Sequence, residues 1–159
     1  MADEEPAPQA LRLDGYLPYR LSVASNAVSR LIARAYEDRF GLTIPQWRLI
    51  AVLAEKGPLT QQAIGACTVM DKVTVSRATQ GLVKRRLVQR APHDVDGRSH
   101  RLALSRTGER LYAEISPVAL KYEARLLQHF DPEAIASLKQ CLQQLERAAE
   151  DLAESGAAG

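Results

Sequence analysis

The stretch that decides the fold is LTQQAIGACTVMDKVTVSRATQGLVKRRLVQRAPHDVDGRSHRLALSR, residues 59–106. Residues 71–86 of it predict a helix, because Asp71 suits a helix cap and apolar side chains then recur at helical intervals. These inward positions are Val75, Ala78 or Thr79, Leu82 and Val83. The opposite face carries donors that can reach phosphates and base edges, namely Lys72, Thr74, Ser76, Arg77, Gln80 and Lys84.

Two kinds of element flank this helix. A shorter helix should precede it, with Thr60 as its cap, an inner face of Ala63, Ile64 and Cys67, and a break at residues 68–70. Short strands are expected at residues 87–90 and 100–104, around the polar turn 92–99. The pattern predicts a winged helix-turn-helix, in a chain that is mainly α with a small β wing.

Charge is concentrated in the same region. Residues 72–106 contain nine Lys or Arg against two acids, a net charge of +7, whereas the whole chain carries only +2 and its remainder therefore −5. Such a basic segment is the electrostatic signature of a surface that meets a phosphate backbone. A solvated charged surface is the alternative on charge alone. Its coincidence with the helix-turn-helix pattern favours duplex DNA as the partner.

These residues resemble the MarR family of bacterial transcriptional regulators. VTVSRATQGLVKRRLVQR, residues 73–90, stands where the recognition helix and first wing strand fall, and DGRSHRLALSRTG, residues 96–108, matches the wing signature. The resemblance covers roughly residues 14–153. Residues 84–86, Lys-Arg-Arg, lack the Gly often found before the wing, a difference that we expect to be harmless. The resemblance implies a two-fold homodimer built from the terminal helices, and most often a repressor.

The rest of the chain predicts further helices. A narrow apolar seam in residues 18–40 indicates one helix ended by Gly41, and Thr43 with Gln46 forms a capping box for a helix through Ala54. After the wing, Ser105 or Thr107 should start a long helix bent at Pro117. Asp131-Pro132-Glu133 should start the last helix.

We therefore expect one domain with two ends that dimerise. The dimerisation helices are residues 14–40 and 106–153, the winged helix-turn-helix is 43–105, and residues 1–13 and 154–159 are flexible tails. A single winged-helix body offers too little surface to cover three long apolar stripes, so a second copy should interleave with them.

A two-fold dimer would bring two recognition helices into successive major grooves of a pseudo-palindromic operator. Arg77 and Gln80 can each make two hydrogen bonds to a base edge, so we expect them to read sequence. Arg98 at the wing tip suits the minor groove, where Asp96 could hold its guanidinium. Asp96 and Arg98 as a solvent-exposed turn pair is the alternative.

The segment from Leu17 to Ala54 is similar to family members that control the breakdown of aromatic acids. That resemblance implies an aromatic acid, or its coenzyme A thioester, as a small-molecule effector. Arg20 could receive its carboxylate, aromatic side chains could face its ring, and polar side chains could supply further contacts. The effector-binding candidates are Tyr16, Tyr19, Arg20, Ser25, Asn26, Trp47 and Arg48. Each has an alternative role in helix packing, ion pairing or plain solvent exposure, and Trp47 most simply belongs to the core.

Other classes of function find little support. The sequence has no nucleophile motif, phosphate loop or metal-binding His motif, so we expect no enzyme, no cofactor and no metal site. Cys67 and Cys141 are expected to be buried small apolar residues and not a disulfide. No apolar run is long enough for a membrane, and we expect a cytoplasmic protein. A constitutive architectural DNA-binding dimer, or a MarR-type regulator of efflux or stress genes, remain alternatives.

Overall fold

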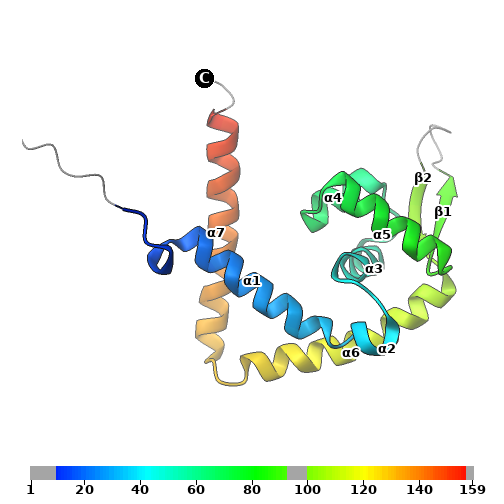
Figure 1. Cartoon of the computed structure of the whole chain (residues 1–159), viewed down its shortest axis with the longest axis horizontal. Coiled ribbons are helices and arrows are strands. Elements are labelled where there is room, and N and C mark those ends of the chain that lie inside the picture. Colours follow the sequence, from blue (N-terminus) through cyan, green and yellow to red (C-terminus); the bar gives the residue numbers. More distant parts are fainter. Residues whose placement is uncertain (1–9, 93–99, 157–159) are drawn as a thin grey trace, which may run out of the picture. The chain divides into compact units, whose positions relative to one another are not determined.

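A computed structural model of the chain describes residues 10–92 and 100–156. It divides into two compact units, Met1–Ala119 and Leu120–Gly159. Within the described ranges the chain is mostly helical with one two-stranded antiparallel sheet (Figure 1). The elements are η1 (Leu13–Gly15), α1 (Leu17–Ala33), α2 (Glu37–Phe40), α3 (Ile44–Lys56), α4 (Gln61–Thr68), α5 (Lys72–Lys84), β1 (Val88–Pro92), β2 (His100–Leu104), α6 (Arg106–Leu127) and α7 (Pro132–Gly156). This confirms the predicted winged-helix fold class.

The core of the first unit lies where α3, α4 and α5 pack against one another, with the sheet beside them (Figure 1). Each element contributes apolar side chains that are almost completely buried. They include Leu49, Ile50, Leu53, Ile64, Val75, Leu82, Leu87, Val88 and Leu102. Burying these side chains is the main stabilising contribution to the unit, and it fixes which faces of α4 and α5 remain outside.

The predicted helix starts are confirmed by capping hydrogen bonds. Thr43 and Gln46 form a reciprocal capping box, in which Gln46 N donates to Thr43 Oγ1 at 3.4 Å and Thr43 N donates to Gln46 Oε1 at 3.1 Å. Thr60 Oγ1 accepts from Ala63 N at 3.2 Å and so caps α4. Asp71 Oδ1 accepts from Thr74 N at 2.8 Å and so caps α5. Each bond satisfies an amide that the first helical turn leaves without a partner.

The wing strands pair antiparallel, with Val88 opposite Leu104 and Pro92 opposite His100. Val88 and Leu102 turn inward and are buried. Leu59, just before α4, adds to the same sheet, since its amide donates to Leu102 O at 3.0 Å and its carbonyl accepts from Leu102 N at 2.7 Å. The first strand runs one to two residues later than predicted, and most of the predicted turn, residues 93–99, lies outside the described residues.

The single helix predicted over residues 18–40 is wrong. The chain leaves the helix at Arg34 and resumes it as α2, which Gly41 ends in the left-handed conformation at φ 59°. Ala33, Ala35 and Tyr36 are all buried. Positions two apart lie on nearly opposite sides of a helix, so Ala33 and Ala35 reach the same core only if the helix is interrupted.

The prediction that both cysteines are buried is also wrong, because Cys67 and Cys141 are both exposed in the single chain. In the short helix α4 only Ile64 is fully buried, and the chain turns away directly after it at Val69. Val69 adopts the left-handed conformation at φ 53° and is 93% exposed. Cys141 lies on α7, which fully buries none of its residues within one chain.

The end of α5 is closed by a left-handed cap that centres on Arg86, whose φ is 57°. Leu87 N donates to Leu82 O at 3.0 Å, and Arg86 N donates to Val83 O at 2.9 Å. This is the position at which the resembled family often carries Gly. We expected the absence of this Gly to be harmless. It places an arginine in a left-handed conformation, which costs a residue with a side chain on the order of 1 kcal/mol of conformational free energy.

The same corner holds the start of α6. Ser105 Oγ donates to Arg86 O at 2.6 Å and accepts from Gly108 N at 3.0 Å, while Ser105 N donates to Leu87 O at 3.0 Å. Of the two helix starts predicted here, the structure therefore has Ser105. Gly108 is buried against this corner so closely that a Cβ on it would overlap Leu87 O.

We predict that Gly108→Ala destabilises the protein by about 1–3 kcal/mol, because the added methyl must displace a backbone carbonyl that is already hydrogen-bonded. Urea unfolding followed by circular dichroism measures the change. Gly156→Ala is the matched control, since a Cβ on Gly156 would meet nothing within 4 Å. Equal unfolding midpoints for Gly108→Ala and the wild type would contradict the close contact.

Arg86→Gly should instead stabilise the protein, by about 0.5–1 kcal/mol, because glycine adopts a positive φ without steric cost. Arg86→Ala removes the same side chain but keeps the conformational cost, so it is the control in the same unfolding experiment. If Arg86→Gly were no more stable than Arg86→Ala, the conformation assigned to Arg86 would be wrong.

Candidate nucleic-acid interface

Helix α5 has one buried and one exposed face. Val75, Ala78, Thr79 and Leu82 are buried, as the apolar pattern predicted, whereas Val83, also predicted to face inward, is half-buried. On the other side Lys72, Arg77, Gln80 and Lys84 are exposed, while Thr74 and Ser76 are half-buried. The helix carries three cations and no acid, so its exposed face is positively charged. Its guanidinium, amide and ammonium groups can donate hydrogen bonds to phosphates or to base edges.

The first turn of α5 is held by Asp71 and Thr74. Besides the backbone bond, Thr74 Oγ1 donates to Asp71 Oδ2 at 2.7 Å. The hydrogen bonds from the Thr74 side chain and backbone lower the pKa of the Asp71 carboxyl, so the cap is ionised at neutral pH. Because the hydroxyl proton of Thr74 is already used, this residue can offer a DNA contact only as an acceptor.

Arg85 has a role that sequence reasoning missed. Its guanidinium donates to Phe40 O at 2.6 Å and to Gly41 O at 3.0 Å, and so ties the end of α5 to the end of α2. Arg85 was counted with the basic segment, but this cation is engaged by the protein itself. Nothing local in the sequence marks it, since its partners lie 44 and 45 residues away. Helix α5 is thus anchored to α2 as well as to α6.

The sheet adds two further cations to this region. Arg90 on β1 and Arg101 on β2 are exposed, and both belong to the basic segment. The wing-tip candidates Asp96 and Arg98 lie outside the described residues, so their minor-groove roles stay predictions.

The proposed effector-binding residues fall into two groups. Tyr16, Tyr19, Arg20, Ser25 and Asn26 are exposed at the beginning and along the first half of α1. The other two lie on α3, where Arg48 Nη2 donates to Ser29 Oγ of α1 at 3.4 Å. Arg48 is the candidate that the structure joins to α1 by a hydrogen bond.

Trp47 lies in an aromatic stack. Its ring centroid is 5.3 Å from that of Tyr36 and 5.8 Å from that of Tyr112, at interplanar angles of 23° and 18°. Burial raises the pKa of Tyr36 to about 12, with a smaller contribution from Glu37, so its phenol stays protonated. Trp47 thus joins the residues before α2 to α3 and α6, which favours the packing role over contact with a ligand ring.

Within residues 10–92 and 100–156, no helix is both long and apolar enough to cross a membrane.

Comparison with known proteins places the chain among bacterial regulators. The model of the MarR family matches residues 40–99, which hold most of the basic segment, α3, α4 and α5. The uncharacterized HTH-type transcriptional regulator YwoH of Bacillus subtilis is 34% identical over 119 residues, covering 71% of this chain and 86% of that protein.

Solved structures agree with this match. A MarR/EmrR family transcriptional regulator from Acinetobacter sp. ADP1 superimposes with a TM-score of 0.81 at 25% identity, over 89% of this chain and 99% of that one. BpsR of Bordetella bronchiseptica, whose DNA binding is regulated by 6-hydroxynicotinic acid, has the same fold, with a TM-score of 0.74 at 19% identity over 82% of this chain and 98% of that one. Members of the family are transcriptional regulators and not enzymes, as predicted for this chain. The chain belongs to the MarR family of transcriptional regulators.

Proposed function

We propose that this regulator binds a pseudo-palindromic duplex operator as a homodimer, with α5 in the major groove. The observation that carries the proposal is the division of α5 into a buried apolar face and an exposed face with three cations and the Gln80 amide but no carboxylate. A helix of this kind fits a major groove, where each base pair presents a distinct set of donors and acceptors.

The exposed side chains divide by the contacts that they can make. Arg77 and Gln80 lie near the middle of α5 and can bond to two atoms of one base, so we assign them to sequence readout. Lys72 and Lys84 lie at the two ends of α5 and are assigned to phosphates, and Thr74 and Ser76 supply short polar contacts. Asp96 and Arg98 complete the proposal at the wing, where Arg98 would enter the minor groove.

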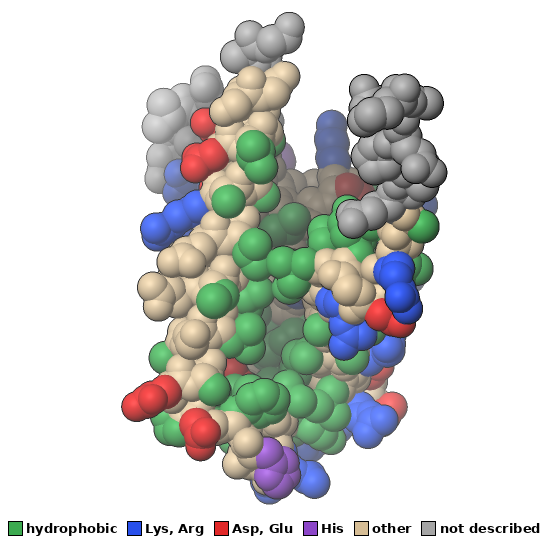
Figure 2. All heavy atoms as spheres, turned by 90° about the vertical axis from the view of Figure 1, so that its left-hand side faces the viewer, with side chains coloured by type: hydrophobic (Ala, Val, Ile, Leu, Met, Phe, Trp, Pro, Cys, Tyr) green, Lys and Arg blue, Asp and Glu red, His purple; other side chains and the backbone are tan. Residues whose placement is uncertain are grey.

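The dimer is supported by apolar side chains that one chain leaves exposed. On α1, Leu17 is 51% exposed, and on α7, Leu138 is 50% and Leu152 is 74% exposed. The face drawn in Figure 2 shows many hydrophobic side chains open to solvent. The helical segments 14–40 and 106–153 of a second copy would cover such stripes, and regulators of this family bind DNA as dimers. The winged helix, residues 43–105, would then be presented twice, about one helical turn of DNA apart.

We further propose that an aromatic acid, or its coenzyme A thioester, releases the protein from DNA and thereby relieves repression of genes for aromatic-compound breakdown. Support comes from Arg20, which is exposed on α1 and follows Tyr16 and Tyr19 in sequence, while Ser25 and Asn26 are exposed further along the same helix. Arg48 is held at the same helix through Ser29. The proposal is also supported by the similar fold of BpsR, a regulator whose DNA binding is regulated by an aromatic acid. The ligand would act by favouring a spacing of the two α5 helices that does not fit the operator.

Two substitutions on α5 test the DNA contacts. Arg77→Ala should lose about 1–3 kcal/mol of discrimination between the operator and a scrambled duplex, because it removes a base contact.

Lys72→Ala should weaken binding to both duplexes and lower the slope of the logarithm of affinity against the logarithm of salt concentration by about one. Fluorescence anisotropy with an operator obtained by selection from random duplexes measures both effects.

Lys56→Ala, which removes an exposed cation at the end of α3, outside the basic segment and the dimerisation segments, is the control for overall charge. If Arg77→Ala still discriminates between the operator and the scrambled duplex as the wild type does, Arg77 does not contribute to sequence readout.

The effector is tested by isothermal titration of the protein with hydroxybenzoates, hydroxycinnamates and their coenzyme A thioesters. Arg20→Ala should weaken binding of the active compound by about tenfold or more, since a charge-assisted hydrogen bond contributes about 1.5–3 kcal/mol. Arg34→Ala removes another exposed arginine near the same helix and should leave binding unchanged. Equal affinities for Arg20→Ala and the wild type would refute the assignment, and no binding at all would favour a constitutive DNA-binding dimer.

A further inference from the structure

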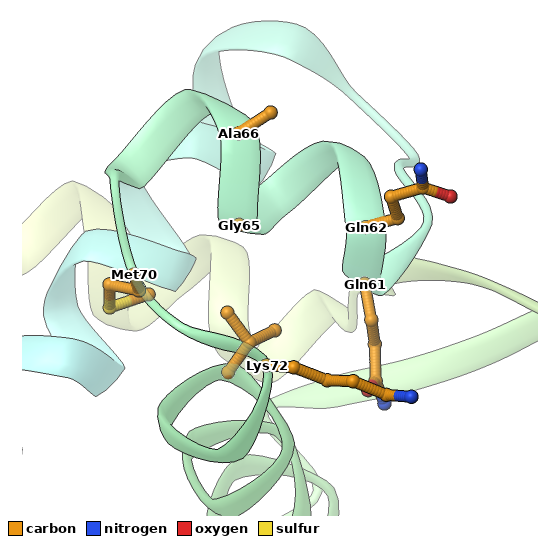
Figure 3. A pocket seen from close by; sticks show the side chains of 7 residues that line it. Gln61, Gln62, Gly65, Ala66, Met70 and Lys72 are labelled. Atoms are coloured by element: carbon orange, nitrogen blue, oxygen red, sulfur yellow. The ribbon is translucent and has the colours of Figure 1, made fainter. Parts of the chain in front are cut away.

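A hollow of about 390 Å³ lies between α4 and α5, inside the helix-turn-helix itself (Figure 3). Its volume is within the range of cavities that bind small molecules. None of its lining residues is among the effector-binding candidates on α1 and α3. It is therefore a separate place in the fold at which a small molecule could meet the protein.

Two small residues of α4, Gly65 and Ala66, are among the residues that line the hollow. The turn after α4 then closes one end, as Met70 N donates to Gly65 O at 3.2 Å. A Cβ on Gly65 would already lie 3.2 Å from Met70 O and 3.7 Å from Val75 Cγ2. The floor is thus made of Gly65, Met70 and the buried Val75, which is an apolar surface.

The polar groups gather at the other end. Figure 3 shows the Lys72 and Gln61 side chains converging there, while Met70 lies on the opposite side. The lining holds one cation and no acid, so its charge is complementary to a single negative group. An ammonium beside an amide can bind a carboxylate, and the flexible Met70 side chain can adapt to an apolar body.

We propose that the α4–α5 hollow binds a small amphipathic carboxylate, with its anionic group at Lys72 and Gln61 and its apolar body against Met70 and Val75. The same chemistry is offered by a substituted benzoate and by a medium-chain fatty acid, and the experiment distinguishes these two sources. Since Lys72 also belongs to the proposed DNA-binding face, the bound molecule would neutralise a phosphate contact and exclude DNA directly. That consequence rests on the proposed function, whereas binding to the hollow does not.

Methionine labelling gives a direct readout of this hollow. The chain has two methionines, Met1 and Met70, so a ¹³C-methyl label reports Met70 by one resonance and Met1 by the other. In the absence of DNA, titration with 4-hydroxybenzoate or with octanoate should shift the Met70 signal saturably and leave the Met1 signal in place. The acid that does so identifies the source, and benzyl alcohol, which lacks the charge, should bind at least tenfold more weakly.

Matched variants locate the anionic group. Lys72→Met should weaken binding about tenfold, and Gln61→Leu should weaken it less, because an ammonium binds a carboxylate more strongly than an amide does. Lys84→Met removes the cation at the other end of α5, which does not line the hollow, and should bind as the wild type does. Arg20→Ala should also bind normally, which separates this hollow from the effector site proposed on α1.

The proposal is overturned if neither acid shifts the Met70 signal saturably, if Lys72→Met and Lys84→Met bind the acid alike, or if benzyl alcohol binds as well as the acids.

Competition with DNA is then measured by fluorescence anisotropy. The carboxylate should raise the apparent Kd of the wild type for duplex DNA and leave that of Lys72→Met nearly unchanged. If Met70 responds but the protein binds no duplex, the carboxylate site stands and the DNA-binding function fails. If Lys72→Met loses DNA affinity while Met70 does not respond, the hollow serves the DNA backbone instead.

Discussion

The recognition unit depends on the hydrogen-bonded corner at which α5 ends, the wing begins and α6 starts. One hydroxyl, that of Ser105, bonds at once to the carbonyl of Arg86 and to the amide of Gly108. Gly108 then allows α6 to approach the Leu87 carbonyl more closely than any side chain would permit. Because all three elements share these few atoms, α5 has a fixed direction relative to both the wing and the first turns of α6.

A second anchor acts from the other side of α5. Arg85 binds the last carbonyls of α2, while the Asp71 cap holds the first turn of the helix. Both ends of α5 are therefore secured by side chains whose hydrogen bonds are made within the protein, and the middle of the helix is free to present Arg77 and Gln80. A rigidly held helix loses little conformational entropy when it binds a partner, which is the general advantage of a preorganised site. Through the same hydrogen bonds, a movement of α2 or α6 would be transmitted to α5.

Much of the fold was predictable because its signals are local. The Thr43–Gln46 capping box, the Thr60 and Asp71 caps and the two faces of α5 each depend on residues within a few positions of one another. The errors concern contacts between distant residues. The interruption before α2 follows from burial of Ala33, Ala35 and Tyr36 in one core, and the engagement of Arg85 follows from carbonyls on another helix. At the candidate site, the sequence indicated which side chains are polar but not which of them already form hydrogen bonds within the protein.

The central claim is that two copies of this chain present two anchored α5 helices to one duplex. Selection of bound sequences from a random pool of duplexes, at low salt and with the full-length protein, tests this most directly. The expected result is enrichment of an imperfect inverted repeat whose half-sites are centred about 10 base pairs, or one helical turn, apart. A pool that stays random after repeated rounds, or that converges on a single unrepeated motif, would contradict it.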